Sequence, residues 1–276
     1  MQHTKSMSFS AEEIAALAVH LSPERLAALN NLTGSTDLAV ELHQETLRLG
    51  ASLMCVTATI EIALRNTVCD NLARHFGSPA WLVAPPAPFT WRDTEEKSVS
   101  RALDSARRAE YSKLSQADKA ALDAAAFPRG RPANLSHLGR AKARRQQMHV
   151  TTGKVVAELT LHFWKRLFGP EYEHSLWRPT LKATFPNKRI SRASVATHLE
   201  NVYQSRNRLA HHEPVLHKRF DDTLEAVEFI IENLNASSRS AETPLAKLLA
   251  TEIAGVKAKS KELHDRLAAF RLPATP

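Results

Sequence analysis

Glycine is scarce in this chain, with only 8 glycines among 276 residues. Many-stranded sheets need glycine-rich turns between short strands, so this composition disfavours them. Alanine, leucine, glutamate, lysine and arginine dominate instead, and these residue types favour helices. We therefore predict an all-α fold built from several packed helices.

Cysteine is rarer still, since Cys55 and Cys69 are the two cysteines of the whole sequence. Both lie in one apolar, helix-like segment without CxxC spacing, which argues for a reducing compartment and against a disulfide framework or a cysteine zinc site. No uninterrupted apolar run reaches membrane-spanning length, and the N-terminus lacks the pattern of a secretion signal. We expect a soluble, cytoplasmic protein that has no membrane partner.

Several catalytic motifs are missing as well. The sequence contains no phosphate loop, dinucleotide-binding, serine-hydrolase or paired-carboxylate signature. The stretch "HEPVLH" invites comparison with the zinc-binding HExxH helix, in which two histidines four residues apart share one face. His212 and His217 are five residues apart with Pro214 between them, so the comparison fails. We predict no metal site and no cofactor.

Positive charge is abundant, with a formal net charge of +8 and a pI near 9.7. This balance favours a polyanionic partner such as nucleic acid, although a solvated basic surface gives the same composition. The most basic stretch is "FPRGRPANLSHLGRAKARRQQMHV". Its candidate contacts to an RNA backbone are Arg129, Arg131, Arg140, Arg144 and Arg145.

Helix start signals recur along the chain. Capping patterns begin at Ser10, Ser22, Ser35 or Thr36, Thr90, Ser115 and Thr243. With the apolar periodicity they predict helices over 36–76, 93–112, 116–126, 152–169, 191–213, 220–235 and 244–270. Residues 36–76 form either one long helix or two helices joined near Gly50. The serine-rich stretch 236–242 is the one plausible domain boundary.

The second half of the 36–76 helix is apolar on two sides. One stripe holds Leu53, Val56, Ile60, Leu64 and Val68, and the opposite side holds Cys55, Ile62 and Cys69. A helix with two apolar faces belongs in the middle of a bundle, so we expect both faces to be buried.

The stretch "SRNRLAHHEPV", residues 205–215, gathers the polar groups most suited to chemistry. At about 100° per residue, Arg206 falls on the apolar stripe of its helix, where it needs a partner because an unpaired buried charge is costly. Asn207 and His211 are four residues apart and share one edge of that helix. In a structural interpretation, Arg206 pairs with a core carboxylate such as Glu61, and His211 with His212 simply caps the helix.

A catalytic interpretation of the same residues is RNA cleavage without a metal. The 2′-hydroxyl attacks the adjacent phosphorus, a base takes its proton, an acid protonates the leaving 5′-oxygen, and a cation stabilises the phosphate charge. Histidine suits either proton transfer, and arginine matches phosphate. One histidine per chain leaves one proton-transfer group missing, which a symmetric homodimer would supply.

The sequence also resembles a known family. "RNRLAH" is similar to the Rx4–6H motif of HEPN-superfamily ribonucleases. The stretches "IEIALRNTVCDNLARHFGSPAWL", "AELTLHFWKRLFG", "LWRPTLKATFP" and "RNRLAHHEPV" resemble, in order and content, Abi-like proteins of bacterial abortive infection, which belong to the HEPN group. The resemblance extends over roughly residues 10–235.

This resemblance implies a HEPN-like helical bundle, homodimerisation, and a metal-independent, toxin-like endoribonuclease of phage defence, sometimes restrained by a protein or RNA antitoxin. Arg206, Asn207 and His211 would be the catalytic motif residues. Auxiliary candidates are His212, Glu213, Glu61, Arg65 and Asn66. The expected organisation is a disordered lead-in over 1–9, an Abi-like domain over 10–235, and a linker with an extra C-terminal amphipathic helix over 236–276. The alternative is a non-catalytic helical module that binds RNA or senses phage, in which the Arg206 cluster is structural.

Overall fold

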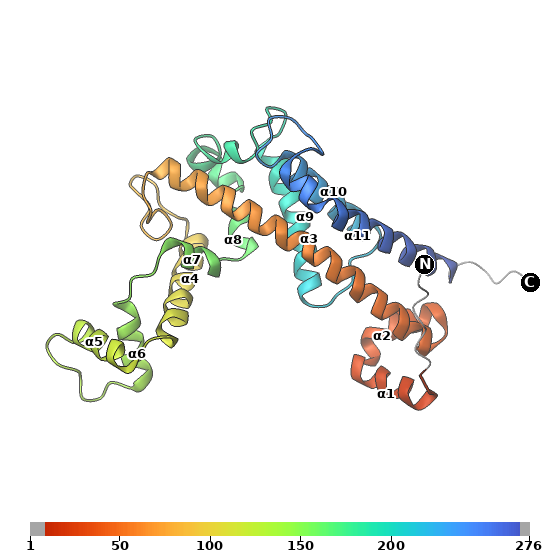
Figure 1. The fold of residues 1–276 in the computed structure, drawn as a ribbon, viewed down its shortest axis with the longest axis horizontal. Helices are drawn as coiled ribbons and strands as arrows, with labels where there is room; N and C mark the ends of the chain where they lie inside the picture. Colours follow the sequence, from red (N-terminus) through yellow and green to blue (C-terminus); the bar gives the residue numbers. More distant parts are fainter. Residues whose placement is uncertain (1–8, 271–276) are drawn as a thin grey trace, which may run out of the picture. The chain divides into compact units, whose positions relative to one another are not determined.

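A computed structural model describes residues 9–270, and every regular element in that range is helical (Figure 1). The all-α prediction is therefore confirmed. Most of the predicted lead-in, residues 1–8, lies outside the described residues.

The helices follow the chain in this order: α1 (Ala11–Leu21), α2 (Pro23–Thr33), α3 (Thr36–Phe76), α4 (Asp93–Ser112), α5 (Gln116–Ala126), α6 (His137–Gln146), α7 (Thr152–Glu158), α8 (Leu161–Arg166), α9 (Arg192–Ala210), α10 (His217–Asn233) and α11 (Pro244–Ala269). Short helical turns η1 (Pro170–Tyr172), η2 (Glu173–Trp177) and η3 (Leu181–Thr184) connect α8 to α9.

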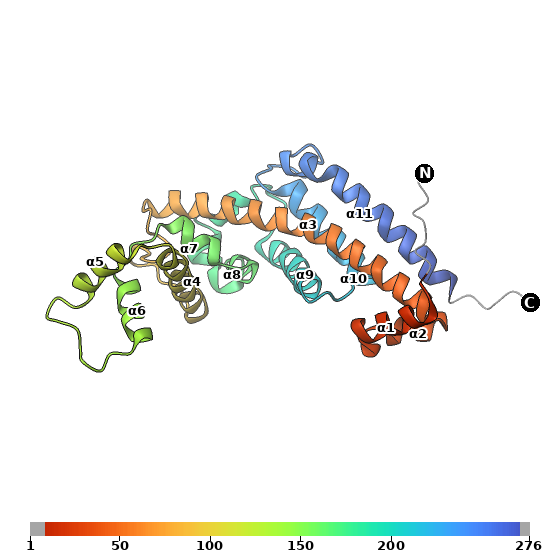
Figure 2. The same cartoon turned by 60° about the horizontal axis from the view of Figure 1, so that its bottom comes forward.

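The chain divides into two compact units, and the first of them is made of two separate stretches of sequence. The first joins the residues up to Ala63 with those from Thr197 onward, and the second is residues 64–196. The sequence predicts a domain over 10–235, then a linker and a C-terminal amphipathic helix over 236–276. That helix, α11, packs against α10 within the first unit, and Arg266 on α11 pairs with Glu41 and Glu45 on α3 (Figure 2).

Most of the predicted caps are present. Ser10 and Ser115 form reciprocal capping boxes with residues three positions later, and the Thr243 hydroxyl accepts from the backbone N–H of Ala246. The Thr90 cap is wrong, although α4 does begin at Asp93. Arg92 is the extended residue before α4, and it makes no side-chain cap hydrogen bond.

The long helix α3 runs through Gly50 without a break. Its predicted core stripe is buried, from Leu53 to Val68. The opposite side is not, because Cys55 is exposed and Ile62 keeps 50% of its surface exposed, so the prediction of two buried faces is wrong. By length and hydropathy alone α3 would suffice to cross a membrane, although polar residues interrupt its apolar runs, and core helices of soluble proteins meet the same criteria.

In the second unit an aromatic cluster fills the core. Trp81, Trp91 and Phe163 pack with Tyr172, whose hydroxyl donates to the buried Glu95 carboxylate at 2.7 Å. The single helix predicted over 152–169 is wrong. Leu159 is extended, which ends α7 and lets α8 start in a new direction with Phe163 and Trp164 buried.

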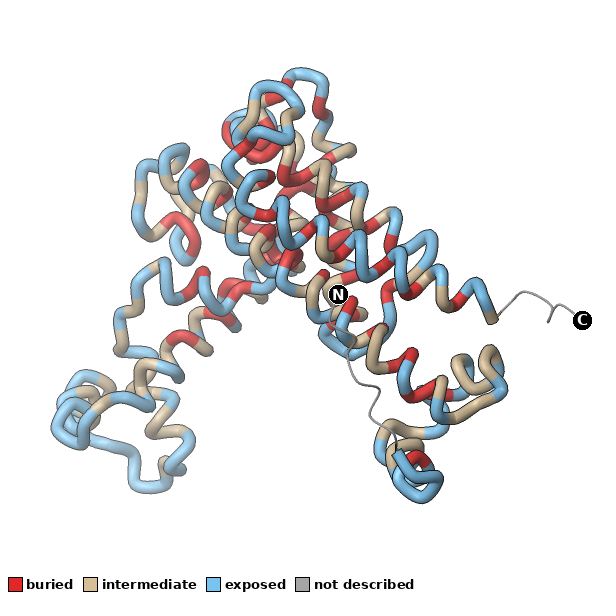
Figure 3. Tube along the Cα trace, turned by 45° about the vertical axis from the view of Figure 1, so that its right-hand side comes forward, coloured by how far each residue is buried: buried red, intermediate tan, exposed pale blue. Residues whose placement is uncertain are grey.

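Helices α5 and α6 differ from the rest of this unit because neither contains a buried residue (Figure 3). They pack against each other, and α6 also contacts α4. Charged contacts rather than an apolar core hold this pair, as described below.

Candidate functional site

The candidate catalytic residues lie at the end of α9. Arg206 and Asn207 are in its last turns, and His211 follows its final residue, Ala210. The backbone N–H of His211 donates to the carbonyls of Asn207 (3.2 Å) and Arg208 (3.1 Å). His212 then adopts a positive φ of 57°, so the helix ends before Pro214 rather than at it.

Arg206 lies at the edge of the core and not on the buried stripe that we predicted. Ser205 is the buried residue of this turn at 1% exposure, whereas the Arg206 side chain is 35% exposed. The Ser205 and Thr223 hydroxyls are 2.5 Å apart, and Thr223 donates to a carbonyl of its own helix, so Ser205 is the donor in that pair. This contact fastens α9 to α10 and turns Arg206 outward.

Glu61 on α3 is the carboxylate closest to Arg206. The Nε atom of Arg206 lies 3.8 Å from Oε2 of Glu61, whose side chain is 16% exposed. This distance is too long for a hydrogen bond and leaves an ion pair. The structural interpretation named this partner, but the guanidinium retains open surface and unused donors toward solvent.

The loop after α9 is held by its neighbours. Glu213 pairs with Arg208 at 3.0 Å, and its backbone N–H donates to the Arg208 carbonyl at 2.9 Å. Arg25 on α2 donates to the carbonyl of His212 at 3.2 Å. Glu213 is thus engaged in fixing the loop, while His211 and His212 are both exposed.

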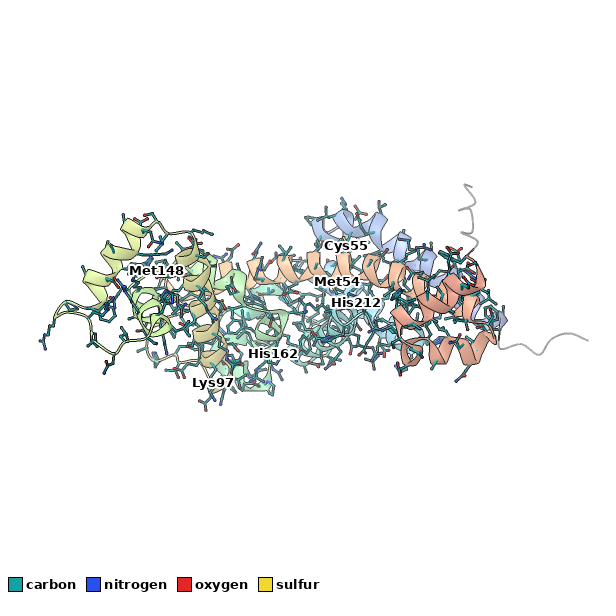
Figure 4. The ribbon with its side chains drawn as sticks, turned by 90° about the horizontal axis from the view of Figure 1, so that it is seen from below. Met54, Cys55, Lys97, Met148, His162 and His212 are labelled. Carbon is teal, nitrogen blue, oxygen red and sulfur yellow. The ribbon has the colours of Figure 1, made fainter. Side chains whose placement is uncertain are left out.

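A hollow of about 390 Å³ opens beside this loop, and apolar atoms make up most of its wall. Met54 on α3 and His212 both line it (Figure 4). Gly50 allows the close approach of the two helices here, because a Cβ at that position would lie 3.2 Å from Cδ2 of Leu209. Gly50 and Leu209 both line the hollow, so a larger side chain at position 50 would enter it.

His217 belongs to a different contact. Its backbone N–H donates to Nε2 of His264 on α11 at 2.8 Å, and the two rings pack edge to face. Within residues 9–270 no group of three or more histidine, cysteine, aspartate or glutamate side chains is arranged to hold a metal ion.

Arg65 and Asn66 continue α3 beyond Glu61 but belong to the second compact unit. Asn66 is exposed. The Nε atom of Arg65 is buried and has no hydrogen-bond partner within the described part of the chain. These two auxiliary candidates thus belong to the second unit, whereas Arg206 belongs to the first.

The basic candidates fall into two groups. Arg140 and Arg144 both bind the carboxylate of Asp123 on α5, and Arg144 also donates to the Tyr111 hydroxyl at 3.0 Å. Hydrogen bonds from the two arginines lower the pKa of Asp123 below its usual range. The second group consists of Arg129 and Arg131, which are exposed in the loop after α5, and Arg145, which is half-buried on α6.

No family model, no curated protein and no solved structure matches this chain.

Three features of the site were not found from the sequence. The Ser205–Thr223 contact, the Arg25 contact and the apolar hollow all join residues far apart in the chain. Gly50 was the one local signal, since a glycine inside a long helix often marks a close approach.

Proposed function

We propose that this protein is a metal-independent endoribonuclease of abortive-infection phage defence, whose cleavage site is formed by Arg206, Asn207 and His211. The observation that carries the proposal is the state of Arg206. Its guanidinium is only loosely paired, 3.8 Å from Glu61, and it remains accessible five residues before an exposed histidine. A phosphate could replace or join Glu61 as a partner, because the arginine fork matches phosphate oxygens.

In this proposal the reaction is an internal phosphoryl transfer in RNA. The 2′-oxygen forms a bond to phosphorus while the bond from phosphorus to the 5′-oxygen breaks, which leaves a 2′,3′-cyclic phosphate and a 5′-hydroxyl. His211 takes the 2′-hydroxyl proton or protonates the leaving oxygen. Arg206 stabilises the charge that develops on phosphate, and Asn207 orients the substrate or His211.

A second proton-transfer group is needed for the full reaction. In a homodimer it would be the same histidine of the second copy. His212 is the auxiliary candidate within the chain, since its side chain is exposed in the same loop. Glu213 suits the role less well because it already pairs with Arg208. An antitoxin, either protein or RNA, would act by covering or competing for this site.

A non-catalytic helical module that binds RNA or senses a phage component is the second candidate. The Arg208–Glu213 ion pair favours it, because this pair assigns one arginine of the "RNRLAH" stretch to a structural contact. In that case Arg206 holds α9 against α3, and His211 has no role in resistance.

Induced expression in a bacterial host tests the proposal. We expect the wild type to stop growth and His211→Ala to allow it, with equal amounts of folded protein judged by circular dichroism of the purified chains. His20→Ala is the matched control, since His20 is also exposed and lies on α1, outside the motif stretch 205–215. Equal toxicity of wild type and His211→Ala would contradict the catalytic assignment and favour the second candidate.

A further inference from the structure

The net positive charge of the chain is concentrated in one segment. Between residues 97 and 146 there are twelve lysines and arginines against four aspartates and glutamates. That excess of eight equals the excess of the whole chain, which has 37 basic and 29 acidic residues. The remainder of the protein is therefore close to neutral, so a polyanion would be attracted mainly to this segment.

Within the segment, α5, α6 and the loop between them form what we call the basic arm, residues 116–146. It has no buried residue, and the Asp123 carboxylate holds α6 to α5 through Arg140 and Arg144. On the other side of α6, Lys142 is exposed and Arg145 is half-buried. Within the described residues these two side chains have no ion-pair partner, and neither do Arg129 and Arg131 in the loop. Arg140 and Arg144 thus stabilise the packing of α5 on α6. The other basic side chains of the arm have no acidic partner of their own among residues 9–270.

A second hollow, of about 450 Å³, lies on this arm. Its lining residues are Asp123, Ala124, Phe127, Arg131 and Arg140. Phe127 ends α5, with its backbone N–H bonded to the Asp123 carbonyl at 2.8 Å. Gly130, with a φ of 95°, donates its N–H to the Phe127 carbonyl at 3.0 Å, which closes a turn between Phe127 and Arg131. Phe127 and Arg131 therefore flank a defined turn, and both side chains line the same hollow.

We propose that this hollow binds a nucleotide of single-stranded RNA. The Phe127 ring stacks on the base, and Arg131 with the outer edge of Arg140 binds the adjacent phosphate. Asp123 does not repel the phosphate, because Arg140 and Arg144 together exceed its single charge. Arg129, Lys142 and Arg145 hold the flanking phosphates of the strand.

The composition of the surface favours nucleic acid over an anionic membrane. An interfacial helix needs a broad apolar face, whereas α6 exposes one large apolar residue, Leu138 at 80% exposure. Single-stranded RNA is favoured over a duplex, because a stacked or paired base cannot reach Phe127 without leaving its helix. The choice of RNA as the ligand rests on the proposed function. The binding site itself is independent of the proposed catalytic residues, because the hollow does not include Arg206 or His211.

Fluorescence anisotropy of the full chain tests this proposal. The probe is a labelled single-stranded 2′-O-methyl oligoadenylate of roughly 12 nucleotides, a length typical of the sites of single-strand-binding domains. It has no free 2′-hydroxyl to attack the phosphorus. Phe127→Ala and Phe127→Leu should each weaken binding about 5- to 150-fold, the range measured for loss of one stacked base, while Phe127→Trp should retain it. Arg131→Gln should reduce the slope of log K against log salt by about 0.7.

The double variant Lys188→Gln with Arg189→Gln is the matched control, because both side chains are exposed in the same unit but outside the arm. It should change the affinity and the salt slope less than Arg131→Gln does. Circular dichroism should show the same helix content for every variant, and Phe127→Trp guards against a folding defect.

Three results would overturn the proposal. They are unchanged binding in Phe127→Leu, an equal effect of Phe127→Leu on a duplex RNA of the same length, and Phe127-dependent binding to phosphatidylserine vesicles without binding to the oligonucleotide. Because this probe cannot be cleaved through its 2′ position, failure of the Arg206–His211 assignment would leave the Phe127 result intact. Failure of the Phe127 result would likewise leave cleavage by His211 untouched.

Discussion

The Nε atom of Arg206 lies 3.8 Å from the Oε2 atom of Glu61, and both side chains keep part of their surface open to solvent. The strength and burial of this ion pair bear on whether Arg206 is catalytic or structural. A loosely paired, accessible arginine suits phosphate binding, whereas a buried pair would have suited a purely structural role.

Because the pair is partly exposed, its removal should cost little stability. We predict that Glu61→Gln and Arg206→Gln each lower the free energy of unfolding by less than about 1 kcal/mol. Urea denaturation of the two single variants and of the double variant measures this value and the coupling between the residues. A loss of about 3 kcal/mol or more in either single variant would instead mark a buried, structural ion pair.

Gly50 should respond to substitution differently from Gly255, although both lie inside helices. Nothing lies within 4 Å of a Cβ at Gly255, so Gly255→Ala should stabilise α11 by about 0.5–1 kcal/mol. A Cβ at Gly50 meets Leu209, and the larger side chain of Gly50→Leu should destabilise the chain by about 1–3 kcal/mol through overpacking. Thermal unfolding of the two variants compares them directly. Equal stabilisation by Gly50→Ala and Gly255→Ala would show that the Leu209 side chain moves aside at little energetic cost.

The two cysteines should differ in reactivity. Cys55 is exposed on α3, while burial raises the pKa of the Cys69 thiol to about 12. Since the thiolate is the reactive form, a disulfide reagent at pH 8 should label Cys55 quickly and Cys69 slowly in the native state. Denaturant should make both react. Equally fast labelling of both native thiols would show that the C-terminal part of α3 around Cys69 opens readily.

Asp123 should control the attachment of α6. We predict that Asp123→Asn speeds amide hydrogen exchange over residues 137–146 and leaves α9 unchanged, because α6 has no buried residue to hold it otherwise. The pKa of Asp123 is lowered in the folded chain, so its stabilising effect is complete above the ordinary value of 3.8 and is lost as the pH falls through the lower folded value. Exchange in α6 of the wild type should therefore stay slow down to about pH 4. Unchanged exchange in Asp123→Asn would show that other contacts carry the arm.

Much of the helical fold was predictable because its signals are local. Capping boxes at Ser10 and Ser115 and the Thr243–Pro244 start set helix ends through residues three positions apart. The break at Leu159 was missed, since no glycine or proline marks it and the apolar pattern continues across it. The open side of α3 at Ile62 was also missed, because an apolar pattern does not say which face another helix will cover.

At the candidate site, the motif was readable but its surroundings were only partly so. Glu61 was named as a partner of Arg206 because an arginine near a core stripe requires a carboxylate. The stripe itself was misjudged by one position, since Ser205 could bury its hydroxyl against Thr223 and thereby release Arg206. The capture of Arg140 and Arg144 by Asp123 depends on how α5 and α6 pack, which charge counts along the sequence do not reveal.

Cleavage of RNA by the purified chain in the presence of EDTA tests the central claim most directly. We predict that the wild type produces fragments with 2′,3′-cyclic phosphate and 5′-hydroxyl ends, that His20→Ala produces the same fragments, and that His211→Ala and Arg206→Gln do not. An RNA pattern that is identical for wild type and His211→Ala would contradict the assignment of His211 as the proton-transfer group.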